Sequence, residues 1–201
     1  MIEAYIGLGS NREHPVDKIT AACEQVSRLP ATQLVVVSSL YRSAPMVAAS
    51  EAGQSRSSYH HSGRPRYQAA LRRRQQDYVN AVIKIETELS ALQLLNRLQG
   101  IENRLGRLRT GYRWGPRPID LDLLLYGKCV LRLPRLQVPH YGLVERAFVV
   151  IPLMEIAGEA LRIPGKGRLS DVLAPALEQE LEQLDSCIGK CSARSLSDLA
   201  V

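Results

Sequence analysis

Long apolar runs are missing from this sequence and cysteines are few, and each scarcity argues against a class of protein. No apolar stretch approaches the roughly 20 residues of a membrane-spanning helix, so we expect no membrane association. The first residues carry neither the basic region nor the apolar core of a secretory signal. The 4 cysteines are scattered, and the nearest pair, Cys187 and Cys191, has no partner histidines. We therefore expect reduced thiols and a cytoplasmic location.

Acidic residues are too few to balance the basic ones, but the excess is confined to one segment. The net charge of +6 would by itself suggest a nucleic-acid partner. Residues 47–76 hold 6 arginines and 1 glutamate, so they account for +5 and the rest of the chain for +1. The charge therefore does not indicate nucleic-acid binding by the domain as a whole.

Strand and helix patterns are mixed along the 201 residues, a length that suits one domain better than two. Alternating or β-branched stretches predict strands over 2–8, 34–41, 79–86 and 119–126, with a short strand at 129–131. Helical spacing predicts helices over 15–29, 90–108, 147–157 and 170–186, and Ser90 suits the cap of the second. We expect an α+β fold, a mostly antiparallel sheet covered by helices.

Two acids, Asp120 and Asp122, stand in an otherwise apolar strand. Residues two apart share one face of a strand, so their backbones would lie about 7 Å apart. Unpaired, the two carboxylates would repel each other and lose hydration. One or two hard divalent cations would resolve both problems.

Arginines precede this acid pair in the sequence. Arg113 and Arg117 lie on a loop just upstream, and carboxylates on metal with arginines on an anion form a layout for phosphoryl transfer. The alternative is that the two acids simply lie on a solvent-exposed strand and have no role in a site. Leu124 and Tyr126, which we expect on the same face, weaken that alternative because the face is not uniformly wet.

The stretch that starts at Arg113 reads R-W-G-P-R-x-x-D-L-D-L and resembles the signature of the 6-hydroxymethyl-7,8-dihydropterin pyrophosphokinase family. Four further motifs agree with this family and follow in its order, at residues 5–11, 38–45, 77–81 and 138–148. The resemblance covers roughly residues 1–46 and 77–175. It implies a ferredoxin-like three-layer α/β/α sandwich. It also implies transfer of the β,γ-diphosphate of ATP to the pterin hydroxymethyl group in tetrahydrofolate biosynthesis, with release of AMP.

The resemblance also assigns roles to individual residues. The expected catalytic residues are Arg107 and Arg117 at the phosphates, with Asp120 and Asp122 as ligands of two Mg²⁺ ions. The expected ATP-binding residues are Gln99, Glu102, Arg107, Arg109, Arg113, Trp114, Arg117, Leu123, Arg135, His140, Tyr141 and Arg146. The expected pterin-binding residues are Ser43, Ala44, Met46, Tyr78, Asn80, Trp114 and Phe148. Without the resemblance, core packing is the simpler interpretation of Phe148, the only phenylalanine.

Three positions and one segment depart from the family pattern. Ser43 and Ala44 stand where threonine and proline are usual, and Thr110 stands where a basic residue often occurs. The connection at 47–76 is much longer than in the family, so we interpret it as an Arg-rich loop inserted into a single domain of residues 1–186. This loop is either a plain surface excursion or an electrostatic lid over ATP. Residues 187–201 are expected to be a flexible tail.

Two other functions stay open at this point. A sheet of this class can bind RNA through exposed aromatic residues, but Asp120 and Asp122 would repel a nucleic-acid backbone. A homologue could also bind nucleotide without catalysis, although the intact acid pair argues against this. We expect a monomer whose partners are ATP and the pterin, with no nucleic-acid or membrane partner.

Overall fold

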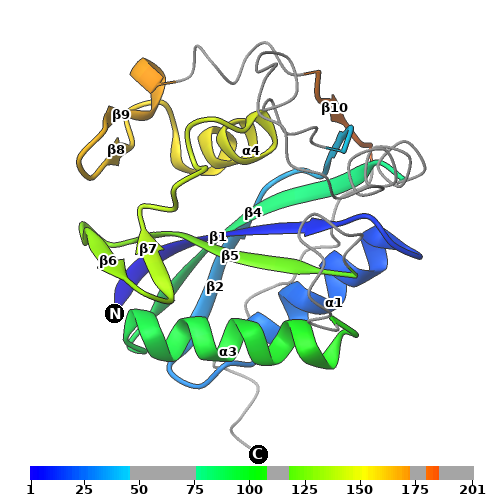
Figure 1. Cartoon of the computed structure of the whole chain (residues 1–201), viewed down its shortest axis with the longest axis horizontal. Helices are drawn as coiled ribbons and strands as arrows, with labels where there is room; N and C mark the ends of the chain where they lie inside the picture. Colours follow the sequence, from blue (N-terminus) through cyan, green and yellow to red (C-terminus); the bar gives the residue numbers. More distant parts are fainter. Residues whose placement is uncertain (46–75, 108–117, 173–179, 186–201) are drawn as a thin grey trace, which may run out of the picture.

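An antiparallel sheet of six strands forms the centre of the described chain (Figure 1). The computed structural model describes residues 1–45, 76–107, 118–172 and 180–185. Neighbouring strands follow the order β10 (Glu182–Gln183), β3 (Tyr41–Ser43), β4 (Tyr78–Thr87), β1 (Ile2–Ser10) and β5 (Asp120–Tyr126), and β2 (Thr32–Val37) also pairs with β4. All of these pairs are antiparallel, so the predicted α+β class with an antiparallel sheet is confirmed.

Helices cover both faces of this sheet. α1 (Pro15–Ser27) and α3 (Ala91–Arg104) lie on one face, and α4 (Ala147–Ala157) lies on the other (Figure 1). The predicted cap of α3 is confirmed, because Ser90 Oγ accepts from Gln93 N at 3.4 Å and Gln93 Oε1 accepts from Ser90 N at 2.9 Å. These reciprocal bonds satisfy amides that the first helical turn leaves without partners.

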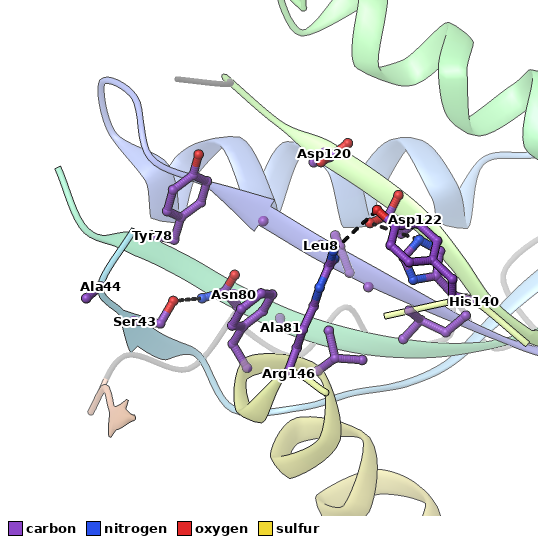
Figure 2. A pocket seen from close by; sticks show the side chains of 16 residues that line it. Leu8, Ser43, Ala44, Tyr78, Asn80, Ala81, Asp120, Asp122, His140 and Arg146 are labelled. Atoms are coloured by element: carbon purple, nitrogen blue, oxygen red, sulfur yellow. Dashed lines mark hydrogen bonds and ion pairs between the residues drawn. The ribbon is translucent and has the colours of Figure 1, made fainter. Parts of the chain in front are cut away.

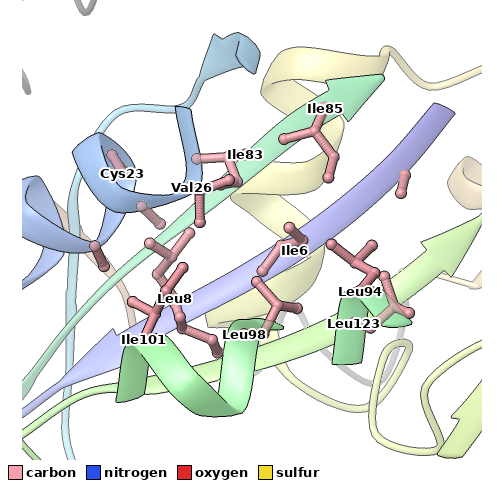
Figure 3. Packing of buried hydrophobic residues seen from close by; sticks show 14 of the residues in the cluster. Ile6, Leu8, Cys23, Val26, Ile83, Ile85, Leu94, Leu98, Ile101 and Leu123 are labelled. Atoms are coloured by element: carbon pink, nitrogen blue, oxygen red, sulfur yellow. The ribbon is translucent and has the colours of Figure 1, made fainter. Parts of the chain in front are cut away.

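Alternation along β1 sends its side chains into two separate apolar cores. Ile6 and Leu8 are buried against α1 and α3 in the larger core (Figure 3). Tyr5 points to the opposite face and is buried with residues of α4. On that second face Gly7 and Gly9 follow Tyr5, so the end of the strand carries no side chains there.

β5 contains an irregularity that simple alternation does not predict. Ile6 pairs with Leu123, but the preceding residue, Tyr5, pairs with Leu125. Leu124 is therefore an extra residue, a β-bulge, and both Leu124 and Leu125 are buried on the side of α4.

The bulge exchanges the two faces for the rest of the strand. Tyr126 lies in the core under α1 and α3, where its hydroxyl donates to Leu89 O at 2.6 Å. The expectation that Tyr126 shares the face of the acids was wrong for this reason. Asp120 and Asp122 precede the bulge and keep their common face.

The predicted strand over 34–41 is interrupted and forms β2 and β3. Between these strands Ser38 N donates to Val82 O, and Ser38 Oγ accepts from Val82 N, both at 2.9 Å. A hydroxyl thus replaces a carbonyl in the ladder with β4, and residues 38–40 leave the regular pairing. The β-branched run gave no sign of this break, because it depends on a partner from another strand.

The predicted helix over 170–186 is wrong in its last part. A 3-10 helix, η2 (Leu169–Val172), covers its start, and residues 173–179 lie outside the described chain. Glu182 and Gln183 form β10, and Leu184 N donates to Leu40 O at 2.8 Å. The leucine spacing fitted a helix, but the edge of β3 offers backbone partners that only an extended segment can use.

Two small hairpins complete the described chain. They join β6 (Leu131–Leu133) to β7 (Leu136–Val138), and β8 (Arg162–Ile163) to β9 (Gly167–Arg168). The strand predicted at 129–131 corresponds to β6, displaced toward the C-terminus. The tail at 187–201 and the insertion, apart from Gln76, lie outside the described residues. No helix within the described ranges combines the length and apolarity that crossing a membrane requires.

Candidate active site

A cavity of about 290 Å³ opens where β1, β4 and β5 meet the start of α4 (Figure 2). Residues far apart in the sequence meet here, from the first strand to the first turn of α4. The predicted site residues that line it are Ser43, Ala44, Tyr78, Asn80, Asp120, Asp122, His140, Tyr141, Arg146 and Phe148. The structure therefore brings 10 of the predicted pterin-side and ATP-side residues to one cavity.

The floor of the cavity is bare backbone. Gly7 pairs with Asp122 and Gly9 pairs with Asp120 across the β1–β5 ladder. A Cβ on Gly9 would lie 3.3 Å from Asn80 Oδ1, and one on Gly7 would lie 3.4 Å from a methyl of Leu124. The two glycines thus leave a flat surface on which a planar ring can approach the strand.

Asp120 and Asp122 both face this cavity, as the alternation predicts. Each is half-buried, whereas Leu121 between them is buried in the core on the other side. The entry to β5 is tied to β1, because Ser10 Oγ donates to Pro118 O at 2.6 Å. The acid pair is therefore fixed on a strand of the sheet, β5, which pairs with β1, and not on a loop.

A buried carboxylate supports this strand from behind. Glu102 on α3 is only 1% exposed, and its Oε1 accepts from Leu121 N at 2.8 Å. Arg107 Nη1 donates both to Glu102 Oε1 and to Asp120 Oδ1, the latter at 2.5 Å. Glu102 and Arg107 thus stand beside Asp120, with Glu102 directed at the protein and not lining the cavity.

The charge of Glu102 depends on these neighbours. Burial, with a smaller contribution from the nearby Asp120 carboxylate, raises its pKa to about 7. The Leu121 amide and the Arg107 guanidinium act in the opposite direction. Arg107 therefore stabilises two carboxylates that would otherwise repel each other.

His140 stands at the acid end of the cavity as a neutral imidazole. Burial, and then the positive charge of Arg146, lower its pKa to about 4, although the nearby Asp120 opposes the change. Gly142 N donates to His140 Nδ1 at 3.3 Å, so we assign the proton to Nε2. Nε2 lies 3.8 Å from Asp122 Oδ2, and a neutral ring makes this a polar contact and not an ion pair. An N–H donor therefore stands beside the acid pair.

Arg146 places a positive charge in the cavity at the N-terminus of α4. Its Nη2 donates to Tyr141 Oη at 3.3 Å, and its guanidinium carbon lies 5.3 Å from the Tyr141 ring centroid. The same carbon lies 6.0 Å from the Phe148 ring centroid. Arg146 therefore links the end that carries the acids to the end that carries Phe148 (Figure 2).

The other end of the cavity offers an amide and aromatic rings. Asn80 Nδ2 donates to Ser43 Oγ at 3.0 Å and to Tyr41 O at 3.3 Å, so both amide hydrogens are used within the protein. Its Oδ1 is the atom that remains to accept from a ligand. Ser43 keeps the hydroxyl that this network needs, which explains how serine can replace the family's threonine.

Phe148 and Tyr78 line the same end without being fully buried. Phe148 packs on the edge of the core beneath α4 and also faces the cavity. Core packing therefore accounts for only part of its position. Aromatic faces and an amide edge are the groups that a flat heterocycle needs.

Several predicted residues are not brought to this cavity. Arg135 Nη2 donates to Gln99 Oε1 at 3.1 Å and to Asn96 Oδ1 at 3.0 Å, and neither Arg135 nor Gln99 lines the cavity. The side chain of Leu123 is buried in the core on the opposite face, so the structure does not place it with the ATP-binding residues. Predicted site residues outside the described chain are Met46, Arg109, Arg113, Trp114 and Arg117.

Residues that sequence reasoning did not assign to the site also line the cavity. Leu124 and Val149 contribute apolar walls, and Gly7 and Gly9 contribute the floor. Gly7 and Gly9 belong to the motif at residues 5–11, one of those that carry the family resemblance. Nothing in the local sequence signalled Val149, because its position depends on how α4 lies over the sheet.

The sequence is similar to proteins of one family over most of its length. The profile of the family described as 7,8-dihydro-6-hydroxymethylpterin-pyrophosphokinase (HPPK) matches residues 5–158. The 2-amino-4-hydroxy-6-hydroxymethyldihydropteridine pyrophosphokinase of Haemophilus influenzae is 40% identical over 185 residues, covering 92% of this chain and 99% of that protein. The enzyme of the same name from Pseudomonas aeruginosa is 41% identical over 180 residues, covering 90% of this chain and 95% of that protein.

A solved structure supports the fold. Plasmodium falciparum HPPK-DHPS, crystallised with pteroate, superposes with a TM-score of 0.59 at 12% identity, over 86% of this chain and 42% of that chain. The present chain thus spans less than half of that longer protein, and this likeness concerns the fold alone. From the profile and the two bacterial relatives, the chain belongs to the 7,8-dihydro-6-hydroxymethylpterin-pyrophosphokinase family and is a diphosphate-transferring enzyme of folate biosynthesis.

Proposed function

We propose that the cavity holds ATP and 6-hydroxymethyl-7,8-dihydropterin end to end. The phosphates lie at Asp120 and Asp122, and the pterin lies against Asn80 and Phe148. The observation that carries this proposal is the polarity of one continuous cavity, with carboxylates and an arginine at one end and aromatic rings and an amide at the other. The pterin hydroxymethyl oxygen bonds to the β-phosphorus, the α,β-bridging bond of ATP breaks, AMP leaves, and the hydroxyl proton passes to solvent.

The acid pair suits magnesium. Within the described ranges no three acidic, histidine or cysteine side chains are grouped as a metal cage. Magnesium does not need such a cage, because it commonly takes one or two carboxylates and completes its shell with water and substrate phosphates. Asp120 and Asp122 would hold one or two ions that arrive with ATP. A bound ion supplies charge neutralisation at the phosphates.

Three side chains near the acid pair complete the phosphate site in this proposal. His140 donates a hydrogen bond from Nε2 while remaining uncharged, so it adds no charge beside Asp122. Arg146 and Arg107 supply positive charge on two sides of the pair, from the start of α4 and the end of α3. None of the three is a strong base, so the residues act by orientation and electrostatics.

The pterin end is specified by the direction of its hydrogen bonds. Asn80 presents an acceptor oxygen, so it selects a ring edge that carries N–H groups. The pterin's amide and amino groups form such an edge. Phe148 and Tyr78 supply apolar faces for the ring, and the glycine floor lets it lie close to β1.

The proposal also includes the finer features that the resemblance implies. These are the ferredoxin-like three-layer arrangement, a single cytoplasmic domain at 1–186 that acts as a monomer, and the absence of nucleic-acid or membrane partners. Further phosphate, nucleotide and pterin contacts are proposed for Gln99, Arg135, Met46, Arg109, Arg113, Trp114 and Arg117. Leu123 and Glu102, whose side chains are buried in the protein, are proposed to support the nucleotide side through the positions of β5 and α3.

The test is an assay for AMP formation from ATP and 6-hydroxymethyl-7,8-dihydropterin in the presence of Mg²⁺. We expect AMP and pterin diphosphate in equal amounts, and no AMP when either the pterin or the metal is left out. AMP formation without pterin would indicate a hydrolase. Binding of both substrates without AMP would indicate a homologue that has lost catalysis.

A further inference from the structure

Glu155 lies on α4, seven residues beyond Phe148, and its carboxylate accepts from two donors of Ser39, between β2 and β3, and from one donor of Tyr41 on β3. Oε1 accepts from Ser39 N at 2.9 Å and from Ser39 Oγ at 2.8 Å. Oε2 accepts from Ser39 N at 3.0 Å and from Tyr41 Oη at 3.0 Å. None of these groups lines the cavity, so the cluster is separate from the substrate site.

The position of these donors explains what the exposed Glu155 carboxylate contributes. Residues 38–40 leave the regular pairing between β2 and β3, so Ser39 N has no partner in the ladder and would otherwise depend on water. Gln183 Nε2, on β10, donates to Ser39 Oγ at 3.0 Å and completes the cluster. Burial, and then Glu155, raise the pKa of Tyr41 to about 12, so its hydroxyl keeps its proton and acts as the donor.

Tyr41 connects this cluster to the cavity. Its side-chain hydroxyl is held by Glu155, and its main-chain carbonyl accepts from Asn80 Nδ2 at 3.3 Å. The same amide donates to Ser43 Oγ at 3.0 Å, two residues farther along β3. A shift of β3 relative to α4 would therefore move both Ser43 and the amide of Asn80.

α4 carries the facing wall of the cavity. Phe148 and Val149 line the cavity from its first turn, and the middle of the helix packs on the sheet through apolar side chains such as Val150 and Leu153. Apolar contacts are not directional and permit small sliding movements. Within the described chain, the Glu155 cluster adds directional bonds between this helix and the connection that leads into β3.

We propose that Glu155 is a positioning residue for the pterin substrate. It sets the separation between the aromatic wall on α4 and the Ser43–Asn80 wall on the sheet, and so determines pterin affinity without touching either substrate. This inference rests on the proposed placement of the pterin. It predicts a larger effect on the pterin than on ATP, because the acid pair lies on β5, which contributes nothing to the cluster. Among the proposed phosphate-side groups, only Arg146 adjoins α4.

The experiment compares Glu155→Gln with Glu159→Gln, a matched control. Glu159 is exposed just beyond α4, so the control removes the same charge nearby. For Glu155→Gln we expect about a tenfold rise in the KM and calorimetric Kd for the pterin, with kcat and the KM for ATP within about twofold of wild type. The control should match wild type in all four quantities.

Tyr41→Phe removes a single donor and provides a milder variant. We expect about a threefold rise in the pterin KM, and a double variant no worse than Glu155→Gln alone, because both changes act through the same cluster. If Glu155→Gln melts below the assay temperature, Tyr41→Phe decides the question.

The outcomes separate this inference from the proposed function. Equal losses for ATP and pterin, or a lower melting temperature with unchanged pterin Kd, would overturn the positioning role while wild-type activity stands. A wild-type protein that neither binds the pterin nor releases AMP would overturn the proposed function itself.

Discussion

The two faces of the central sheet differ in what their side chains do. Toward α1 and α3, the strands carry large apolar residues such as Ile6 and Ile83, which pack with residues of the facing helix such as Leu98 (Figure 3). All three side chains are fully buried. Toward α4, the ends of the same strands carry Gly9 and Asp122, which line a cavity. Because successive residues of a strand point in opposite directions, one strand can serve a core and a site at the same time. The difference predicts that changes on one face alter stability and that changes on the other alter catalysis.

The face toward α4 is itself divided. Tyr5, Val82 and Leu153 form a small apolar core under the middle of the helix. The cavity begins beyond this core, where β1 carries glycines and α4 has its first turn. The site is therefore the part of this face that the helix does not fill, and α4 belongs to both the small core and the site.

The largest expected effect comes from removing one carboxylate on the cavity face. Asp122→Asn should lower kcat by on the order of 10²–10³-fold, the scale of losing one preorganised charge interaction at a transferring group. Asp122 is a better choice than Asp120, which Arg107 also holds. Pterin affinity by calorimetry and the melting temperature should stay near wild type. Near-normal turnover would contradict the metal role and the division between the faces.

A change in the large core should lower stability and leave substrate binding unchanged. Leu98→Ala removes a fully buried side chain on α3 and should cost about 2–5 kcal/mol in the free energy of unfolding. Leu92, on the same helix, is 43% exposed, so Leu92→Ala should change stability by less than about 0.5 kcal/mol. Denaturant titration measures both variants. Below its melting temperature, the Leu98 variant should keep wild-type KM values for both substrates.

A change at Phe148 tests whether this residue of α4 belongs to the substrate site or to the small core. Phe148→Ala should weaken pterin binding by about 1–3 kcal/mol, the scale of burying and stacking one aromatic ring. ATP affinity should barely change, as measured by calorimetry. An unchanged pterin affinity combined with a large loss of stability would assign Phe148 to the small core instead.

The smallest expected effect is a pH dependence of stability due to His140. Its folded pKa of about 4 lies below its ordinary value of 6.5, so at intermediate pH the unfolded state binds a proton that the folded state does not. This contribution destabilises the protein as the pH falls below 6.5 and levels off near pH 4.

A comparison of wild type with His140→Gln isolates this term from the other titrating groups. Between about pH 7.5 and about pH 5.5 the free energy of unfolding of wild type should fall by about 1 kcal/mol more than that of the variant. Urea titrations at the two pH values measure the difference. Parallel losses in the two proteins would show that His140 can take up a proton in the folded state.

Local patterns in the sequence predicted much of this structure. Alternation around Asp120 and Asp122 predicted their common face, and Ser90 predicted the cap of α3, in which the structure adds Gln93 three residues later. The apolar run at 147–157 predicted α4 with its limits. Each of these features depends on residues a few positions apart, so the sequence alone contains the information.

Other features were decided only when distant segments met. The bulge at Leu124 arises from the register between β5 and β1, and β10 forms because the edge of β3 has open backbone groups. Glu102 reaches the amide of Leu121, and Glu155 reaches Ser39, 116 positions away in the sequence. Hydrogen bonds across such separations have no periodic signature, because they depend on how helices lie on the sheet. The sequence by itself therefore determined which residues share a face of a strand or helix, and the tertiary structure determined which of them meet at the cavity and what holds them in place.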